Sequence, residues 1–563
     1  MNYKRKVAEV IKSNVDMDLE TIENLIEIPP HTEMGDYAFP CFQLAKIFRR
    51  DPNIIAKELK SKLNEEGFER VENLGGYVNF FIDKSEFIKN TLEKILLEGD
   101  NYGSSNVGEG KTICIEYSSP NISKNFQVRH LFSALIGNSL YKLFIKEGYS
   151  VKRLNHLGDW EVKVGKLISA YKRWGNEESL EIDVMSELLR IYVKFHEEAQ
   201  KDSLLEDEGR EYFKSLKEKD EEVEALWKKF RDLSLREFEK IYDIFNIRFD
   251  SYLGESFYED KIEDVFNKLR KSNILSEFNG IQLVMLNKYN MPPCILLKDD
   301  GETIYAARDL AAAIYRKKTY DFYKCIYIAE GTKSVYFKQI FKVLDLLEHQ
   351  WAEDCIHARF GLVKFQDRIN LNIKGEILIL EDLINKSLDK VLEMINEMNP
   401  RLENKENISK RMVVGALVFT FLKNSREKNI IFNLKYILSF EGETALYVQK
   451  SYSIAKGILK SVEDIDITPI FSKLNSKEEL DLVKILEGFS SAIHNATEEL
   501  EPSIITKYII EVTHKFNKFY INQYLLNLKD KELIKARLVL IKATCQVIKN
   551  ALDLIGIEAI EEI

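Results

Sequence analysis

The order of apolar and polar positions divides the 563 residues of the chain into three regions. In residues 1–108, the helix-patterned stretches NIIAKELKSKL and FIKNTLEKILLEG flank GGYVNFFID, which alternates like a strand. An irregular loop that contains three prolines, IEIPPHTEMGDYAFP, precedes them. This mixture predicts a small α/β domain.

Residues 109–380 show the pattern of a parallel sheet with crossing helices. The apolar run TICIEY is followed by the turn-rich loop SSPNISKN, the helical stretch VRHLFSALIGNSLYKLFIKEG and the extended segment YSVKRLNHLGDW. Strand, loop, helix and strand in this order are typical of a βαβ crossover. The sheet pattern resumes in GIQLVML, PCILLK, TIYA and CIYIAEG, with helices such as RDLAAAIYRK between them.

Two further regions have helical patterns. A charged insert at about residues 175–250 predicts a solvated helical hairpin, with apolar residues near helical spacing at Leu226, Phe230, Leu233, Phe238, Ile241 and Tyr242. Residues 381–563 are almost wholly helical in pattern. In the last helix, apolar residues alternate at spacings of four and three from Ile534 to Ile555, and Gly556 follows as the C-cap glycine.

Composition narrows the class of protein. Apolar residues make up 45% of the chain and charged residues 31%, as in ordinary soluble globular proteins. There is no run of 18 uncharged apolar residues and no signal-peptide pattern, and the six cysteines lack metal-ligand spacing. We therefore expect a cytoplasmic monomer with reduced thiols, no membrane partner and no metal site. The net charge of −10 argues against a general nucleic-acid coat but leaves a specific nucleic-acid partner open.

The segment from Lys124 to Asn138 is the strongest candidate for chemistry. A helix that starts at the carboxyl end of a parallel strand offers free N–H groups and a positive dipole end to an anion. Lys124 and His130 are of the types that neutralise a triphosphate and stabilise charge during phosphoryl displacement. Because any α/β protein has such a helix, and a lone histidine near it is usually structural, spacing alone leaves both interpretations open.

Long segments resemble one family. SSPNISKNFQVRHLFSALIGN followed by NHLGDW resembles the first signature of the arginyl-tRNA synthetases, which are class I aminoacyl-tRNA synthetases. IEIPPHTEMGDYAFPCFQLAK resembles their N-terminal tRNA-binding domain, YAARDLAAAIYR their arginine-pocket helix, and SFEGETALYVQ and ARLVLIKATCQVIKNALDLIGI their anticodon-binding bundle. The resemblance implies an α/β Rossmann-type catalytic domain (residues 109–380) between an α/β N-terminal domain (1–108) and an all-α C-terminal bundle (381–563).

The resemblance also implies a reaction and an amino-acid site. In the family, the carboxylate of arginine attacks the α-phosphate of ATP bound with Mg²⁺, and the arginyl group then passes to the terminal ribose of the tRNA. The implied arginine-binding residues are Glu116, Asn121, Tyr305, Asp309 and Lys333. Glu116 or Asp309 can supply the carboxylate that a guanidinium binds through two hydrogen bonds. Both residues also have an ordinary interpretation, Glu116 as a carboxylate at the end of a strand and Arg308–Asp309 as an exposed pair at the start of a helix. Lys333 replaces a glutamine of the family and would repel arginine unless Glu330 or another acid compensates.

The nucleotide side departs from the family pattern. The His-x-Gly-His motif stands here as Gln127-Val128-Arg129-His130, so a side chain replaces the glycine that leaves room for the nucleotide. The Lys-Met-Ser-Lys-like loop stands as RINLNIKGE, which matches the family only at its end. The implied catalytic residues are Lys124, His130 and Lys374, and the implied ATP-binding residues are Gln127, Arg129 and Gly375.

The departures continue after GDW, where Glu161-Val162-Lys163 replaces a Gly-Thr-Gln-like run. They cluster in the catalytic centre while the scaffold segments match the family, so we favour reduced or lost arginylation over full activity. Slow turnover supported by Lys124, His130 and Lys374 is a milder alternative. A non-catalytic tRNA-binding or regulatory paralogue and a repurposed adenylating ligase are further alternatives.

Two sets of residues are candidates for tRNA contact. Tyr77 and Asn79 match family positions that would touch an unpaired base by stacking and amide hydrogen bonding. Lys515, Lys518 and Tyr520 interleave cations with an aromatic ring, which suits an anticodon loop. The first pattern is also expected if Tyr77 and Asn79 simply pack on one face of a strand. The second is also expected of a solvated helix face.

Overall fold

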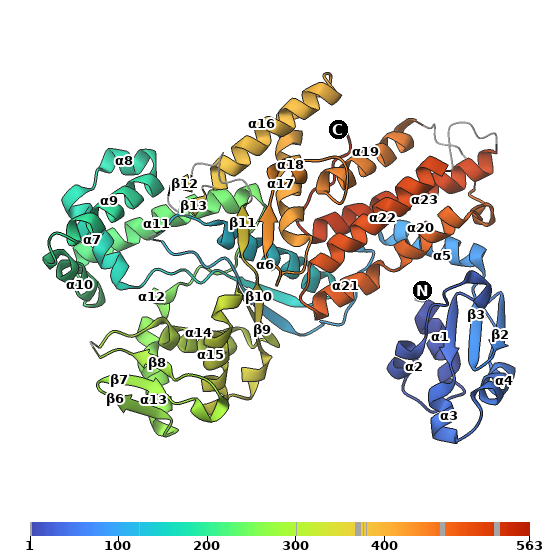
Figure 1. The fold of residues 1–563 in the computed structure, drawn as a ribbon, viewed down its shortest axis with the longest axis horizontal. Coiled ribbons are helices and arrows are strands. Elements are labelled where there is room, and N and C mark those ends of the chain that lie inside the picture. The colour runs from blue at the N-terminus through green and yellow to red at the C-terminus, as the bar shows by residue number, and fades with distance from the viewer. Residues whose placement is uncertain are drawn as a thin grey trace.

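The chain folds into three regions that follow one another along the sequence (Figure 1). The structure is a computed structural model that describes residues 3–122, 124–299, 301–365, 373–374, 377–378, 380–461, 468–522 and 530–563. It confirms the predicted architecture of an α/β N-terminal domain, a Rossmann-type domain and a helical C-terminal bundle. None of the described helices is long and apolar enough to cross a membrane.

The N-terminal domain is built on a three-stranded antiparallel sheet of order β1-β3-β2. Its strands are β1 (Tyr37–Pro40), β2 (Arg70–Leu74) and β3 (Tyr77–Phe81), and its helices are α1 (Tyr3–Lys12), α2 (Leu19–Leu25), α3 (Phe42–Phe48) and α4 (Pro52–Lys62). The side chains of Phe39, Val78 and Phe80 are buried in its core. The next helix, α5 (Lys84–Glu98), packs against α20 and α23 of the C-terminal bundle and so connects the two ends of the chain.

The central sheet has four parallel strands in the order β10-β9-β4-β5. They are β4 (Thr112–Glu116), β5 (Ser150–Leu154), β9 (Lys324–Glu330) and β10 (Cys355–Phe360). Helix α6 (Val128–Lys146) joins β4 to β5, which confirms the predicted crossover, and α14 (Tyr305–Tyr320) and α15 (Ser334–Leu346) precede β9 and β10. The carboxyl ends of the strands therefore meet at one edge, where open α/β sheets bind their ligands.

The other predicted strands do not join this sheet. GIQLVML and PCILLK contain β7 (Ile281–Val284) and β8 (Cys294–Leu297), which form a separate antiparallel sheet with β6 (Leu275–Phe278). TIYA is not a strand, because α14 begins at Tyr305. The prediction is wrong here because a short apolar run does not reveal which strand it pairs with.

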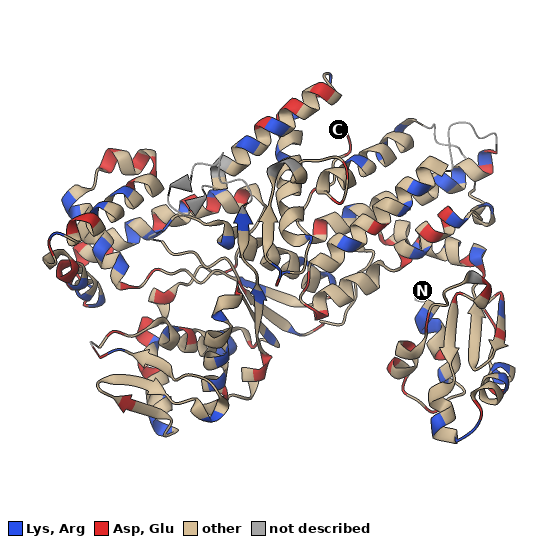
Figure 2. Ribbon diagram, in the orientation of Figure 1, with Lys and Arg blue, Asp and Glu red and all other residues tan. Residues whose placement is uncertain are grey.

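The charged insert is more compact than the predicted hairpin. It consists of α7 (Val162–Trp174), α8 (Glu177–Ile182), α9 (Val184–Ala199), α10 (Leu204–Lys217) and α11 (Glu221–Ile244). These helices enclose a core of their own, with Leu167, Ile191, Phe195 and Phe230 fully buried. The hairpin prediction is wrong because the apolar faces of all five helices pack on one another, while acidic and basic residues intersperse on them (Figure 2).

The C-terminal region is a helical bundle that packs against α6. Its helices are α16 (Leu380–Met398), α17 (Lys405–Leu422), α18 (Leu434–Ile437), α19 (Ala445–Ser461), α20 (Lys477–Glu487), α21 (Phe489–Glu498), α22 (Ser503–Asn522) and α23 (Lys531–Leu554). Gly556 follows α23 with φ of +78°, which confirms the predicted cap. The predicted domain boundaries at residues 108 and 380 lie between α5 and β4 and at the first residue of α16.

Candidate functional site at the carboxyl edge of the central sheet

The candidate site lies at the edge where β9, β4 and β5 end side by side. Glu116 is the last residue of β4 and Glu330 the last residue of β9. The segments that follow β4, β5 and β9, together with the start of α14, carry most of the predicted site residues, so the fold brings them to one edge. We call Glu116, Tyr305 and Asp309 the arginine half, and Lys124, Gln127, Arg129 and His130 the nucleotide half.

In the arginine half, Glu116 is paired with a buried arginine. Oε2 of Glu116 lies 2.6 Å from Nη1 of Arg316, whose side chain is 2% exposed. Burial by itself would lower the pKa of Arg316, but the Glu116 carboxylate raises it well above its usual value. Sequence reasoning missed Arg316, although an arginine within the apolar helical stretch LAAAIYR is a signal for a buried ion pair.

Asp309 belongs to the same network. Its Oδ2 accepts a hydrogen bond from the Tyr336 hydroxyl, and its Oδ1 lies 3.4 Å from Nε2 of His156, whose Nδ1 lies 3.3 Å from Nη2 of Arg316. Burial by itself would raise the pKa of Asp309, but His156 and Tyr336 keep it below its usual value. Asp309 is thus an anion held in place, unlike an exposed helix-start carboxylate. Tyr305 is 54% exposed and its ring centroid lies 5.1 Å from that of Tyr336.

The other two predicted arginine-binding residues lie at the rim. The Asn121 amide donates a hydrogen bond to Glu161, and Oε2 of Glu161 lies 2.6 Å from Nζ of Lys163. Lys333 is exposed in the short helix η5 (Gly331–Lys333), directly after β9. The acid expected to compensate Lys333, Glu330, forms its ion pair with Arg129. Glu161, the residue directly after GDW, therefore binds the amide that the resemblance assigns to arginine, and Lys163 pairs with Glu161.

In the nucleotide half, His130 is a buried neutral imidazole. Its side chain is 8% exposed, and its Nδ1 accepts a hydrogen bond of 3.0 Å from the backbone N–H of Gln127. Burial, with smaller contributions from the charges of Arg129, Lys333 and Lys124, lowers the pKa of His130 to about 3. Since Nδ1 is an acceptor, the proton of the neutral ring is on Nε2. His130 is therefore a neutral hydrogen-bond donor near pH 7, not a cation.

Arg129 extends along the sheet edge to the next strand. Its Nη1 lies 3.8 Å from Oε2 of Glu330, and its side chain is 46% exposed. Burial and the charges of Lys163 and Arg129 lower the pKa of Lys124, and the charge of Glu161 partly opposes them, so these groups lie near one another. Lys374 lies in β12 (Ile373–Lys374), whose side chains are outside the described residues, as is Gly375.

The donor set of the described residues does not form a metal site of its own. No group of three or more histidine, cysteine, aspartate or glutamate side chains is placed to hold an ion within the described ranges. Mg²⁺ commonly binds through substrate phosphates with one or two carboxylates. The fit of Mg²⁺ to this site thus depends on phosphates that ATP would bring.

The residues predicted to contact tRNA are partly buried or form contacts with other side chains of the chain. Asn79 is 4% exposed in β3, while Tyr77 is half-buried with its ring centroid 5.2 Å from that of Phe42. In α22, Nζ of Lys515 lies 3.1 Å from Asp481 and Nζ of Lys518 lies 3.8 Å from Glu478, and the half-buried Tyr520 stacks on Phe516. The charges of both lysines are therefore partly compensated.

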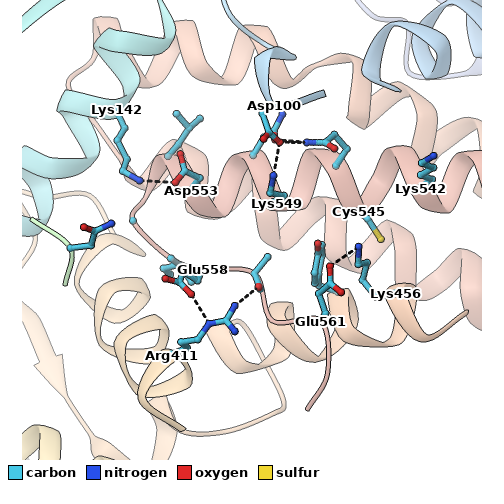
Figure 3. A pocket seen from close by; sticks show the side chains of 18 of the residues that line it. Asp100, Lys142, Arg411, Lys456, Lys542, Cys545, Lys549, Asp553, Glu558 and Glu561 are labelled. Carbon is cyan, nitrogen blue, oxygen red and sulfur yellow. Dashed lines mark hydrogen bonds and ion pairs between the residues drawn. The ribbon is translucent and has the colours of Figure 1, made fainter. Parts of the chain in front are cut away.

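A second positive region, which sequence reasoning missed, lines a cavity of about 1140 Å³ between α6, α17, α19 and α23. We call it the basic cavity; its cations are Lys142, Lys146, Lys410, Arg411, Lys456, Lys535, Lys542 and Lys549. Figure 3 shows four of its ion pairs: Lys142 with Asp553, Lys549 with Asp100, Arg411 with Glu558 and Lys456 with Glu561. The signal was present in the sequence, because Lys535, Lys542 and Lys549 recur every seven residues on one helix face.

Comparisons with known proteins agree with this fold. The family model for the catalytic domain of class I tRNA synthetases (R) matches residues 91–434, and those for the arginyl-tRNA synthetase N-terminal domain and the DALR anticodon-binding domain match residues 1–82 and 448–563. The fold is therefore that of a class I aminoacyl-tRNA synthetase. The structure of Thermus thermophilus arginyl-tRNA synthetase superposes with a TM-score of 0.82 at 21% identity, covering all of both chains. That of Plasmodium falciparum gives 0.79 at 21% identity, covering 100% of this chain and 99% of that one.

Sequence relatives give the family. "Arginine--tRNA ligase" of Clostridium botulinum (strain Alaska E43 / Type E3) is 60% identical over 562 residues, and that of Clostridium beijerinckii is 58% identical over 562 residues. Both alignments cover 100% of each chain. The chain belongs to the arginyl-tRNA synthetase family.

Proposed function

We propose that this chain binds tRNA as a member of the arginyl-tRNA synthetase family and forms arginyl-adenylate from ATP slowly or not at all. The observation that carries the proposal is the position of Arg129. It stands at the start of α6, where the family has a glycine, and its guanidinium reaches Glu330 across the sheet edge. A nucleotide that lies against this helix start would have to displace the arginine side chain and separate the ion pair.

The chemistry of the remaining groups supports weak activation. Transition-state charge on a phosphoryl group is stabilised by preorganised cations and hydrogen-bond donors. Gln127 supplies no charge, and the neutral His130 donates from Nε2 alone. The arginine half, in contrast, retains Asp309, whose pKa is lowered and whose carboxylate is held in a fixed network that suits a guanidinium.

Binding of tRNA is supported by the basic cavity. Eight cationic and four acidic side chains line this cavity, although the net charge of the whole chain is −10. Lys542 forms no ion pair with any residue in the described part of the chain, and it is exposed. A local excess of positive charge on an acidic protein is the electrostatic footprint of a specific nucleic-acid partner.

The test combines ATP–pyrophosphate exchange, arginylation of tRNA and tRNA binding. We expect exchange by the wild type to be at least about a hundredfold slower than by Gln127→His/Arg129→Gly, which restores the family motif. tRNA should bind with a steep salt dependence, and Lys542→Gln should weaken binding relative to the control Lys338→Gln on α15. Fast exchange by the wild type would overturn the catalytic part, and no binding of any tRNA at low salt would overturn the other part.

One observation favours a second candidate, an active arginine–tRNA ligase with unusual motifs. The relatives that carry this name are 60% and 58% identical along the whole chain. Lys124 and His130 are retained, and the arginine half is intact. This candidate requires that the purified wild type charge tRNA with arginine at a rate that Arg129→Gly does not increase.

A further inference from the structure

Four cations stand together at the edge of the central sheet. Lys333 follows β9, Lys124 and Arg129 follow β4, and Lys163 follows β5. These three strands are direct neighbours and parallel, so the four residues come from three separate segments to one edge. The charges of Arg129, Lys333 and Lys124 all act on the buried His130, and that of Lys163 acts on Lys124, as expected for groups in one cluster.

The cluster is only partly compensated. Glu330 pairs with Arg129 and Glu161 with Lys163. Lys124 and Lys333 form no ion pair within the described ranges, and both are exposed. Of the two nearby acids of the arginine half, Glu116 binds Arg316, while Asp309 accepts from Tyr336 and also interacts with the charge of Lys333. An excess of positive charge therefore faces solvent at this edge.

Most of this charge is absent from the family pattern. Arg129 stands where the resemblance expects glycine, and Lys163 and Lys333 stand where it expects glutamine or a similar residue. The positions that have lost a cation or a hydroxyl are Gln127 and the loop around Asn372. Compared with the family pattern, the site has thus gained positive charge at Arg129, Lys163 and Lys333.

We propose that these four cations bind a condensed phosphate, a pyrophosphate or triphosphate unit, without a nucleobase and without a divalent cation. This rests on the proposed function, because Arg129 must exclude the nucleoside. Arginine and lysine can replace the metal in neutralising a phosphate chain, and Arg129 can hold two of its oxygens at once. Helix α6 begins at the same edge, so its positive dipole end adds to the attraction.

The experiment is a calorimetric titration of the full-length protein with inorganic tripolyphosphate in EDTA. We expect saturable binding by the wild type and affinity about tenfold weaker in Lys333→Gln and in Arg129→Gly. Lys338→Gln, an exposed lysine five residues along the chain, should bind like the wild type. ATP in EDTA should bind the wild type more weakly than tripolyphosphate, and Arg129→Gly should reverse this order. Thermal unfolding of each variant checks that it is folded.

Three results would overturn the proposal: no binding of tripolyphosphate, equal losses in Lys333→Gln and Lys338→Gln, or tighter binding of ATP than of tripolyphosphate by the wild type. The last would identify the whole nucleotide, not its phosphate chain alone, as the ligand. Failure here is distinguishable from failure of the proposed function. Absent tripolyphosphate binding with absent pyrophosphate exchange would remove only the condensed-phosphate site, whereas fast exchange by the wild type would remove the proposed function.

Discussion

The two halves of the sheet-edge site are built in different ways. In the arginine half, Glu116, Arg316, His156, Asp309 and Tyr336 form one connected and largely buried network. In the nucleotide half, Arg129 forms a half-exposed ion pair with Glu330, in which Nη1 of the arginine lies 3.8 Å from Oε2 of the glutamate. The first half is preorganised by burial, while the Arg129–Glu330 ion pair of the second half is half-exposed and can rearrange at small cost.

This difference has energetic consequences. Removing one partner of a buried ion pair leaves an uncompensated charge and costs about 3–5 kcal/mol, whereas exposed pairs contribute about 0–1 kcal/mol. Substitutions in the arginine half should therefore affect stability and ligand binding together. Substitutions in the half-exposed ion pair of Arg129 and Glu330 should affect ligand binding with little effect on stability. Each of the following experiments tests one side of this contrast.

The largest effect is expected from Arg316→Met, which leaves Glu116 without its partner. We expect the free energy of unfolding to fall by about 3 kcal/mol, measured by urea denaturation. The control is Lys317→Met, since Lys317 pairs with Asp321 on the surface and the pair contributes little. Equal effects of the two substitutions would show that the network of the arginine half is not a stabilising unit.

A smaller effect is expected from Asp309→Asn on the affinity for arginine. Loss of the anionic partner should weaken binding by about 2 kcal/mol, or roughly thirtyfold, in a calorimetric titration with arginine. Because the pKa of Asp309 is lowered, its carboxylate is ionised at about pH 7, where the titration is carried out. Asp321→Asn, at the exposed end of the same helix, is the matched control. Unchanged affinity in Asp309→Asn would mean that arginine binds elsewhere or not at all.

The smallest effect is expected from Glu330→Gln on stability. The ion pair with Arg129 is half-exposed, so the free energy of unfolding should change by less than about 1 kcal/mol. Thermal and urea unfolding of the variant beside the wild type measure this change. A loss as large as that of Arg316→Met would mean that the two halves of the site contribute equally to stability.

Parts of this structure follow from local sequence signals. The crossover helix α6 and the apolar seam of α23 with its cap at Gly556 were predictable, because helical period and glycine placement are local properties. The pairing of β6, β7 and β8 was not, because strand partners are chosen by tertiary packing. The same holds for the compact insert, whose helices each present an ordinary amphipathic pattern.

Some residues of the site could likewise be identified from the sequence, and others only from the structure. Glu116, Asp309, Arg129 and His130 were identified by resemblance to a family motif, and the structure brings all four to one sheet edge. Their partners Arg316, His156 and Tyr336 lie 27 to 200 residues away from them along the chain, and no local pattern links them. The direction of Arg129 toward Glu330 likewise depends on the strand order, which places the ends of β4 and β9 together.

The central claim is that Arg129 keeps the nucleotide from the start of α6. The direct measurement is a titration of wild type and Arg129→Gly with ATP in the presence of Mg²⁺, followed by calorimetry. We expect no saturable binding by the wild type at millimolar ATP and an affinity at least about tenfold higher in the variant. Equal, tight binding of ATP by both proteins would contradict it.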